Sequence, residues 1–292
     1  MNERRRLPLT PEPMHLWRGF RDVKIAGDSW GDAKGPLVVL QHGGGQTRHA
    51  WRGTGELLGN AGYHAIAYDS RGHGDSDWAP DGDYSQDARV EDLKHILVQL
   101  GGKRPILVGA SMGAGISLVA VGENHVDAVA LVLVDYAAQI DPEGVERIRT
   151  FLHANADGFS SLDDVADAIA SYQPQRNRRR RLDGLAKNVR IGDNGRYYWH
   201  WDPQTIMGNR LKPHERQLRL EASARNVTIP TLLVRGGLSD VLTEGGVKAF
   251  LEVCPRAEYV EVQGAAHMVA GDRNDLFTTA VVDFLARAAP VR

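Results

Sequence analysis

The chain contains a single cysteine, Cys254, and this scarcity excludes an internal disulfide. Its net charge is only -2, so charge balance gives no reason to expect nucleic acid or an anionic membrane as the main partner. No uninterrupted apolar stretch is long enough to span a bilayer, and Pro8, Pro11 and Pro13 follow the basic start where a signal peptide would place its apolar segment. These absences predict a protein of the reducing cytoplasm, with no nucleic-acid or membrane partner.

Short apolar runs alternate along the chain with amphipathic stretches of helical period. The runs cover residues 37–40, 65–68, 106–108, 130–134, 231–234 and 259–262. Strands that are continuously apolar are typical of a parallel sheet with both faces covered. A stretch at residues 20–25 alternates apolar and polar side chains and suits an antiparallel edge strand. The pattern predicts a three-layer α/β fold with a mostly parallel sheet.

One region interrupts this alternation. Residues 141–224 hold no pair of buried strands, but they contain helical patterns at 145–153 and 162–172. A hairpin is expected over residues 190–198, because Asn194-Gly195 favours a tight turn. We therefore predict an inserted cap, or lid, at 141–224, and a core built from residues 1–140 and 225–292.

Residues 105–113 read PILVGASMG, an apolar strand that runs directly into a GxSxG pentapeptide and then into small residues. A serine at a sharp turn from strand to helix adopts strained backbone angles, and glycines on either side remove side chains that would clash with the strand and helix. Ser111 is then exposed above the sheet, between Gly109 and Gly113. This is the sequence of a nucleophile elbow and predicts acyl-transfer chemistry.

Serine needs a base at neutral pH, and the base needs a carboxylate that fixes its tautomer. Ligands on open α/β sheets bind beyond the carboxyl ends of the strands, so the partners are expected just after the strand runs. His267 follows the run at 259–262 and is the expected base. Asp240 follows the run at 231–234 and is the expected acid. The predicted catalytic triad is Ser111, His267 and Asp240.

The transition state also needs donors for its developing oxyanion. The turn His42-Gly43-Gly44-Gly45 follows the run at 37–40, and its minimal side chains let backbone N–H groups approach a ligand. The predicted oxyanion hole combines the backbone N–H of Met112, directly after the nucleophile, with that of Gly44.

With these motifs in place, nearly the whole chain resembles the α/β-hydrolase superfamily, in its capped branch with a serine nucleophile. The likeness rests on the elbow, the 42–45 turn, the segment DSRGHGDS at 69–76 and the histidine loop at 264–268. It implies an eight-stranded sheet, and it implies ester-type chemistry because epoxide hydrolases and dehalogenases of this branch carry aspartate at the elbow. The stretch from 267 to 275 is also similar to bacterial hydrolases related to monoalkyl phthalate ester hydrolases.

Alternatives stay open at three places. Asp135 follows the run at 130–134, and some members of the superfamily place the triad acid there, with the chain order equally satisfied. The 69–76 segment is expected to be a structural turn, since its glycines suit a turn better than a metal site, and no metal is expected. His42 and His49 are expected to order loops.

The cap carries a run of arginines, namely Arg176, Arg178, Arg179, Arg180 and Arg181. Such a run is usually a solvated face, although one guanidinium turned inward would pair with a substrate carboxylate. Trp199 and Trp201 of the cap, and Trp51 near the 42–45 turn, are candidate walls of the substrate pocket, with packing inside the protein as the other interpretation.

The sequence therefore predicts a serine esterase with a lid, acting through an acyl-enzyme on small to medium apolar esters without a cofactor. One alternative keeps the triad and applies it to the carbon-carbon cleavage of a vinylogous diketone. Another is a non-catalytic receptor that retains the pocket. The small-molecule ester is the expected partner, and the choice between a monomer and a homodimer stays open.

Overall fold

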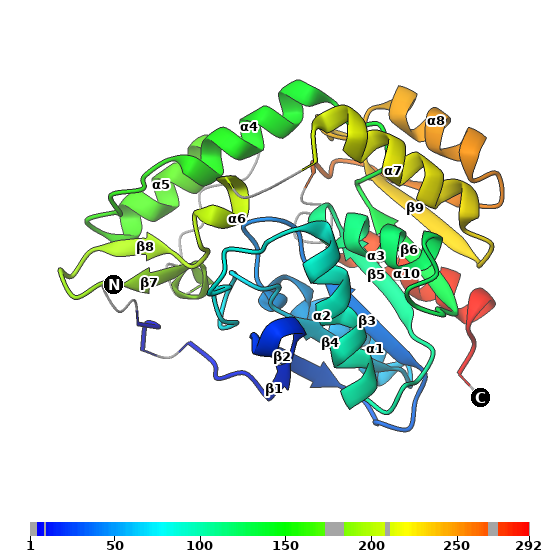
Figure 1. Cartoon of the computed structure of the whole chain (residues 1–292), viewed down its shortest axis with the longest axis horizontal. Coiled ribbons are helices and arrows are strands. Elements are labelled where there is room, and N and C mark those ends of the chain that lie inside the picture. Colours follow the sequence, from blue (N-terminus) through cyan, green and yellow to red (C-terminus); the bar gives the residue numbers. More distant parts are fainter. Residues whose placement is uncertain (1–4, 9, 173–183, 208–210, 268–273, 292) are drawn as a thin grey trace.

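An eight-stranded sheet forms the centre of the protein (Figure 1). The computed structural model describes residues 5–8, 10–172, 184–207, 211–267 and 274–291. Across the sheet the strands are β1 (His15–Arg18), β2 (Lys24–Trp30), β4 (His64–Tyr68), β3 (Leu37–Gln41), β5 (Ile106–Ala110), β6 (Ala130–Val134), β9 (Thr231–Gly236) and β10 (Glu258–Val262). The β1–β2 and β2–β4 pairs are antiparallel, and the other pairs are parallel. The predicted mostly parallel, eight-stranded sheet is confirmed.

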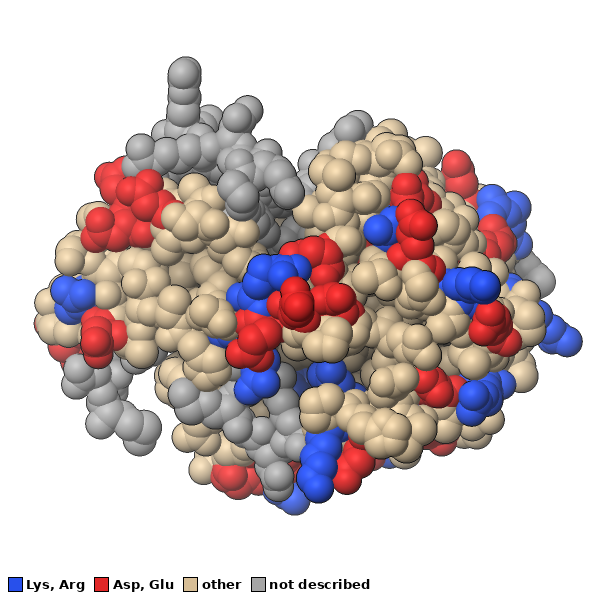
Figure 2. All heavy atoms as spheres, turned by 90° about the horizontal axis from the view of Figure 1, so that it is seen from above, with Lys and Arg blue, Asp and Glu red and all other residues tan. Residues whose placement is uncertain are grey.

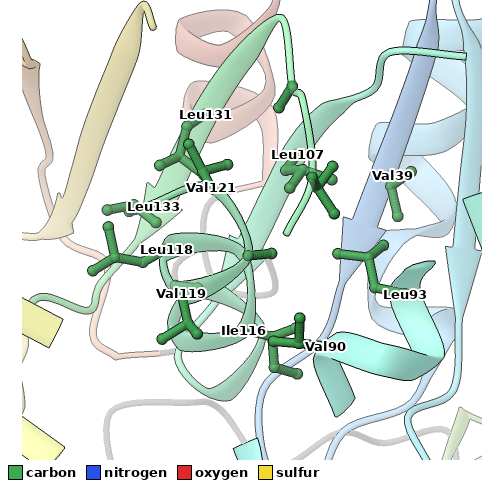
Figure 3. Packing of buried hydrophobic residues seen from close by; sticks show 14 of the residues in the cluster. Val39, Val90, Leu93, Leu107, Ile116, Leu118, Val119, Val121, Leu131 and Leu133 are labelled. Atoms are coloured by element: carbon green, nitrogen blue, oxygen red, sulfur yellow. The ribbon is translucent and has the colours of Figure 1, made fainter. Parts of the chain in front are cut away.

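In the central strands both faces of the sheet are buried, which explains why β3 and β6 are almost continuously apolar. In β3, Leu37 and Val39 belong to one buried cluster, whereas Val38 and Leu40 belong to a second cluster. Because successive side chains of a strand point to opposite faces, one apolar run supplies both clusters. Figure 3 shows the first cluster, in which residues of the sheet meet those of two helices.

Some of the helices cover the two faces of the sheet, and others lie beside it. The helices are α1 (Arg52–Asn60), α2 (Gln86–Gln99), α3 (Met112–Gly122), α4 (Pro142–His153), α5 (Leu162–Tyr172), α6 (Gln204–Met207), α7 (Pro213–Asn226), α8 (Glu244–Val253) and α10 (Asn274–Ala288). Short 3-10 turns lie at Phe20–Asp22, Arg48–Trp51 and Ala186–Asn188. The first cluster includes residues of α2, α3, α7 and α8, and the second includes residues of α1 and α10. The result is a three-layer arrangement.

A separate group of elements lies between β6 and β9 in the chain, to the left of the sheet in Figure 1. It contains α4, α5, α6 and a hairpin of β7 (Val189–Ile191) and β8 (Tyr197–Trp199). These elements have a buried cluster of their own, which includes Phe159, Val165, Trp199 and Trp201. This group is the cap in the rest of the description.

The packing differs from the predicted division into core and cap at two places. Leu220 and Ala224 of α7 belong to the same buried cluster as Leu118 of α3, so α7 packs as part of the core, although the expected cap extended to residue 224. At the other end, Leu7 belongs to the buried cluster of the cap, and Arg5 forms a backbone bridge with Ile191. Packing of an apolar face decides which layer a segment joins, and sequence order alone does not reveal it.

Charged residues of both signs are interspersed over the face shown in Figure 2. A surface of this kind has no extended field of one sign on that face. Among the described residues, no helix combines the length and the apolar character needed to cross a membrane.

Candidate active site

Ser111 lies at the sharp turn between β5 and α3. Its backbone angles are φ 49° and ψ -110°, a sparsely populated conformation for a residue with a side chain. The Ser111 N–H donates to the carbonyl of Val134 at the end of β6 (3.0 Å), which fixes the turn against the neighbouring strand. Strain of this kind is concentrated at functional sites, where surrounding packing maintains it. The predicted elbow is therefore present as a local structure.

The two glycines of the pentapeptide are required by close backbone contacts. A Cβ atom on Gly109 would lie 2.3 Å from the carbonyl of Gly113, and one on Gly113 would lie 2.3 Å from the carbonyl oxygen of Gln41. Because backbone atoms cannot move aside as a flexible side chain can, neither position accommodates a larger residue without a shift of the strand or helix.

His267 follows β10, and its side chain reaches Asp135 at the end of β6. The Nδ1 atom of His267 lies 2.7 Å from Oδ2 of Asp135, whose side chain is fully buried. Asp135 Oδ1 accepts the N–H of Gly236 (2.9 Å), and Oδ2 also accepts the hydroxyl of Ser239. A carboxylate in this position holds the proton on Nδ1, which leaves Nε2 as the acceptor of the ring.

The predicted acid, Asp240, is wrong: it does not contact His267 in the structure. Its side chain is about half exposed and pairs with Arg147 of α4, at 2.9 Å to Nη2 and 3.0 Å to Nε. Ser239 instead turns inward, where it donates to Asp135 and accepts the N–H groups of Val241 and Leu242. The loop after β9 therefore contributes a hydroxyl that supports the carboxylate, and the alternative residue, Asp135, supplies the carboxylate itself.

The expected oxyanion turn lies next to Ser111, because a Cβ atom on Gly43 would be 3.3 Å from the Cβ atom of Ser111. The N–H of Gly43 donates to Oε1 of Gln46 (2.8 Å), and the N–H of Gly45 donates to Nε2 of His73 (3.2 Å). Within the described residues, no hydrogen bond uses the N–H of Gly44.

Met112 is the first residue of α3, where backbone N–H groups have no partner inside the helix. It lines the same cavity as Gly44, Ser111 and His267. The N–H groups of Gly44 and Met112 therefore stay the predicted oxyanion donors, on the cavity that Ser111 lines.

Three buried histidines surround this turn. His42 donates from Nδ1 to the carbonyl of Gly43 (2.8 Å) and accepts the N–H of Ser70 at Nε2 (2.9 Å). The centroids of the His42 and His73 rings are 5.1 Å apart, and those of His73 and His200 are 5.9 Å apart. Burial lowers the pKa of His42, and it lowers that of His73 well below its ordinary value. Both rings are therefore neutral near pH 7, and His42 orders the loop as expected.

The segment DSRGHGDS forms a buried, charged turn. The Asp69 carboxylate accepts from the backbone N–H of Arg48 (2.6 Å), from its guanidinium (2.6 Å) and from the N–H of Asp75 (2.9 Å). Arg48 in turn contacts the carboxylates of Asp28 and Asp75. Asp69 is fully buried and already accepts three hydrogen bonds, which is the arrangement of a structural turn.

A cavity of about 750 Å³ lies between the core and the cap. Trp51, Trp199 and Trp201 all line it. Each also packs inside the protein. The ring centroids of Trp51 and Phe277 are 5.8 Å apart, and the stacked rings of Trp199 and Trp201 have centroids 4.8 Å apart. Lining the cavity and packing inside the protein are thus compatible roles for these tryptophans.

The arginines of the predicted cap, at 176 and 178–181, fall outside the described residues.

Sequence reasoning gave Ser239 no role, and it placed His200 only in an aromatic cluster that could wall the substrate pocket. Ser239 is an ordinary serine in a turn, and only its position beside Asp135 distinguishes it. His200 stands between two tryptophans, and no motif connects it to the 42–45 turn that it contacts (His200 Nε2 to the Gly45 carbonyl oxygen, 3.2 Å). Both contacts join segments far apart in the chain.

Comparison with known proteins identifies the family of this fold. The sequence profile of the alpha/beta hydrolase fold family matches residues 36–273. The esterase Rv0045c of Mycobacterium tuberculosis is 30% identical over 226 residues, which cover 74% of this chain and 70% of the relative. The 2-(acetamidomethylene)succinate hydrolase of Mesorhizobium japonicum is 24% identical over 262 residues, which cover 86% of this chain and 88% of the relative.

Solved structures show the same fold. The crystal structure of an E-2-(acetamidomethylene)succinate hydrolase superposes with a TM-score of 0.80 at 23% identity. The match covers 93% of this chain and 98% of the hydrolase chain. A structure of the Mycobacterium tuberculosis esterase Rv0045c superposes with a TM-score of 0.71 at 25% identity. The match covers 94% of this chain and 93% of the esterase chain. The match over most of its length shows that this chain belongs to the alpha/beta hydrolase fold family.

Proposed function

We propose that this protein is a serine hydrolase of carboxylic esters, with Ser111 as nucleophile, His267 as base and Asp135 as the acid. The observation that carries the proposal is the 2.7 Å contact between Nδ1 of His267 and Oδ2 of Asp135, with His267 and the strained Ser111 lining the same cavity. A buried carboxylate that fixes the tautomer of a histidine next to such a serine is the arrangement that activates a hydroxyl for acyl transfer. Similarity to an esterase supports the same reaction class.

The reaction has two halves. Ser111 Oγ attacks the ester carbonyl carbon while His267 Nε2 takes its proton, and the resulting oxyanion accepts the N–H groups of Met112 and Gly44. The tetrahedral intermediate then expels the alcohol, which leaves with the proton held by His267. Water attacks the acyl-enzyme in the same way, releases the carboxylic acid and restores Ser111. None of these steps requires a cofactor.

The cavity favours an ester with a medium-sized apolar part. Its volume of about 750 Å³ falls in the range of small-molecule sites. Apolar side chains contribute much of its lining, among them Trp51, Val119, Ile148, Phe151, Leu152, Ile169, Trp201 and Leu220. Since apolar surface removed from water stabilises binding in proportion to its area, affinity should rise with acyl length until the cavity is filled. We expect the protein to act in the cytoplasm, as its composition predicts.

A fluorophosphonate probe and a panel of p-nitrophenyl esters test the proposal. We expect the probe to label the wild type at Ser111 and to leave Ser111→Ala unlabelled, and we expect the esters to be hydrolysed only by the wild type. Equal labelling of both proteins would overturn the assignment. Labelling without turnover of any ester would favour the receptor interpretation. Turnover of vinylogous diketones in preference to all esters would favour carbon-carbon cleavage.

A further inference from the structure

His200 follows the cap hairpin, yet its ring contacts the turn that holds the proposed oxyanion donor. The side chain is 1% exposed. Its Nδ1 accepts the backbone N–H of Gly74 (2.8 Å), and its Nε2 lies 3.2 Å from the carbonyl oxygen of Gly45. One ring therefore joins the cap to two loops of the core.

The two contacts fix the protonation state of the ring. A backbone N–H can only donate, so Nδ1 must carry the lone pair, and the proton of the neutral ring is on Nε2, where it can be donated to Gly45. Burial, reinforced by the charge of nearby Arg190, lowers the pKa of His200 to about 3. The ring of His200 is therefore neutral near pH 7.

Gly45 is held on both sides. His73 accepts its N–H and His200 donates to its carbonyl oxygen, so the two peptide planes that flank Gly45 have fixed orientations. Gly45 has φ 73°, and a glycine in this region can leave it at little cost when no bond restrains it. The N–H of Gly44 belongs to the next peptide unit back, between Gly43 and Gly44, which shares the Gly44 Cα atom with the unit that His73 holds. Rotation at Gly45 is therefore transmitted to the donor through Gly44.

We propose that His200 is a positioning residue through which the cap fixes the oxyanion turn. The inference rests on the proposed ester hydrolysis, because it concerns the donor used there. Trp201, beside His200, lines the cavity and would lie 3.5 Å from a Cβ atom on Gly45. The same strip of the cap thus lines the cavity and holds the turn.

Neighbouring contacts anchor this strip to the core independently of His200. The N–H of Asp202 donates to the carbonyl of Gly72 (2.8 Å), and the Asp202 carboxylate accepts the hydroxyl of Tyr84 (2.5 Å). Arg190 also pairs with Asp75 (2.8 Å). A substitution of His200 should therefore loosen Gly45 while the cap stays attached.

Two variants separate the contacts of the ring. An asparagine amide lies near the position of Nδ1, so His200→Asn can keep the bond to Gly74 and loses the donor to Gly45. A glutamine amide lies near the position of Nε2, so His200→Gln can keep the donor to Gly45 and loses the bond to Gly74. His214→Asn, at an exposed histidine of α7, is the matched control.

The measurements are kcat and KM for p-nitrophenyl acetate, the affinity for a trifluoromethyl ketone that forms a tetrahedral adduct, and the melting temperature. Loss of a complete oxyanion donor lowers kcat by about 10²–10³, so a displaced donor should cost about tenfold. We expect His200→Asn to lose about tenfold in kcat and in ketone affinity with KM nearly unchanged. His200→Gln should recover most of both, and His214→Asn should match the wild type.

Equal losses of kcat in the asparagine and glutamine variants, or losses that simply follow the melting temperature, would overturn the proposal. Hydrogen exchange of the amides at 42–47 provides a readout that does not depend on activity, and it should be faster in His200→Asn than in His200→Gln. If the wild type hydrolyses no ester while exchange still separates the two variants, then the proposed function fails and the positioning role stands.

Discussion

The Nδ1 atom of His267 lies 2.7 Å from Oδ2 of Asp135, although 132 positions separate the two residues in the chain. Asp135 reaches this position because it directly follows β6, next to the strand that leads to Ser111, and because it adopts φ 51°. A residue with a side chain rarely has a positive φ, so packing must hold this conformation in place. The buried carboxylate thereby orients a histidine that comes from the edge of the sheet.

Replacement of the carboxylate tests its role. Asp135→Asn should lower kcat by about 10⁴, because an amide favours the wrong tautomer of His267 and cannot stabilise the imidazolium. Asp240→Asn is the matched control and should leave kcat within about twofold, since an exposed ion pair contributes little. Steady-state kinetics on one p-nitrophenyl ester measure both. A large loss in Asp240→Asn with a small one in Asp135→Asn would reverse the assignment.

Ser239 should support the acid. Ser239→Ala removes the hydroxyl that donates to Asp135 Oδ2, and it also leaves the N–H groups of Val241 and Leu242 without their acceptor. Hydrogen bonds to charged groups contribute about 1.5–3 kcal/mol, so kcat should fall by about ten- to hundredfold. Ser239→Thr keeps the hydroxyl and should retain most of the activity. Equal kcat values for Ser239→Ala and Ser239→Thr would contradict a supporting role of the Ser239 hydroxyl.

Stability should fall as the solution becomes acidic. Burial lowers the pKa of His42, lowers that of His73 well below its usual value and lowers that of His200 to about 3, whereas an unfolded histidine titrates near 6.5. Below about pH 6.5 the unfolded chain therefore binds more protons at these positions than the folded chain does. This contribution to stability is fully present above about pH 6.5 and is lost progressively towards the folded pKa values, by up to about 1.4 kcal/mol per pH unit for each ring.

Urea unfolding at pH 7.5, 6.5 and 5.5 measures this dependence. Nearby charges act in both directions, since Asp69 raises and Arg190 lowers the pKa of His200. The variant His200→Gln removes one titrating ring, so the free energy of unfolding should depend less steeply on pH below 6.5 than in the wild type. Identical slopes in the two proteins would argue against a buried, neutral His200.

The elbow should not tolerate a methyl group. Gly113→Ala places a Cβ atom 2.3 Å from the carbonyl oxygen of Gln41, and overpacking against backbone should cost about 2–4 kcal/mol. Gly245→Ala, in α8, meets only Thr243 Oγ1 at 3.7 Å and should be neutral or stabilise the protein by about 0.5–1 kcal/mol. Denaturant unfolding compares the two variants. Equal free energies of unfolding would contradict the close approach at Gly113.

Local patterns predicted the elements that depend on nearby residues. Helix α5 begins and ends where its apolar period indicated, at Leu162 and Tyr172, and the hairpin turn contains Gly195 with φ 73° as the Asn-Gly pair suggested. The sequence also predicted the elbow, because its glycines are required by close backbone contacts within the turn and with the neighbouring strand β3. Prediction failed at α7, whose apolar residues gave no indication of which layer they would join.

The sequence by itself determined the order of the parallel strands and the helices between them, the elbow at Ser111, the place of His267 after a strand and the glycine turn at 42–45, because each of these depends on periodicity or on steric limits within a short segment. Only the tertiary structure decided between Asp135 and Asp240. Both follow core strands in the correct chain order, and which carboxylate meets His267 depends on the direction in which two loops leave the sheet. The same applies to His200, which reaches the oxyanion turn only when the cap packs on the core.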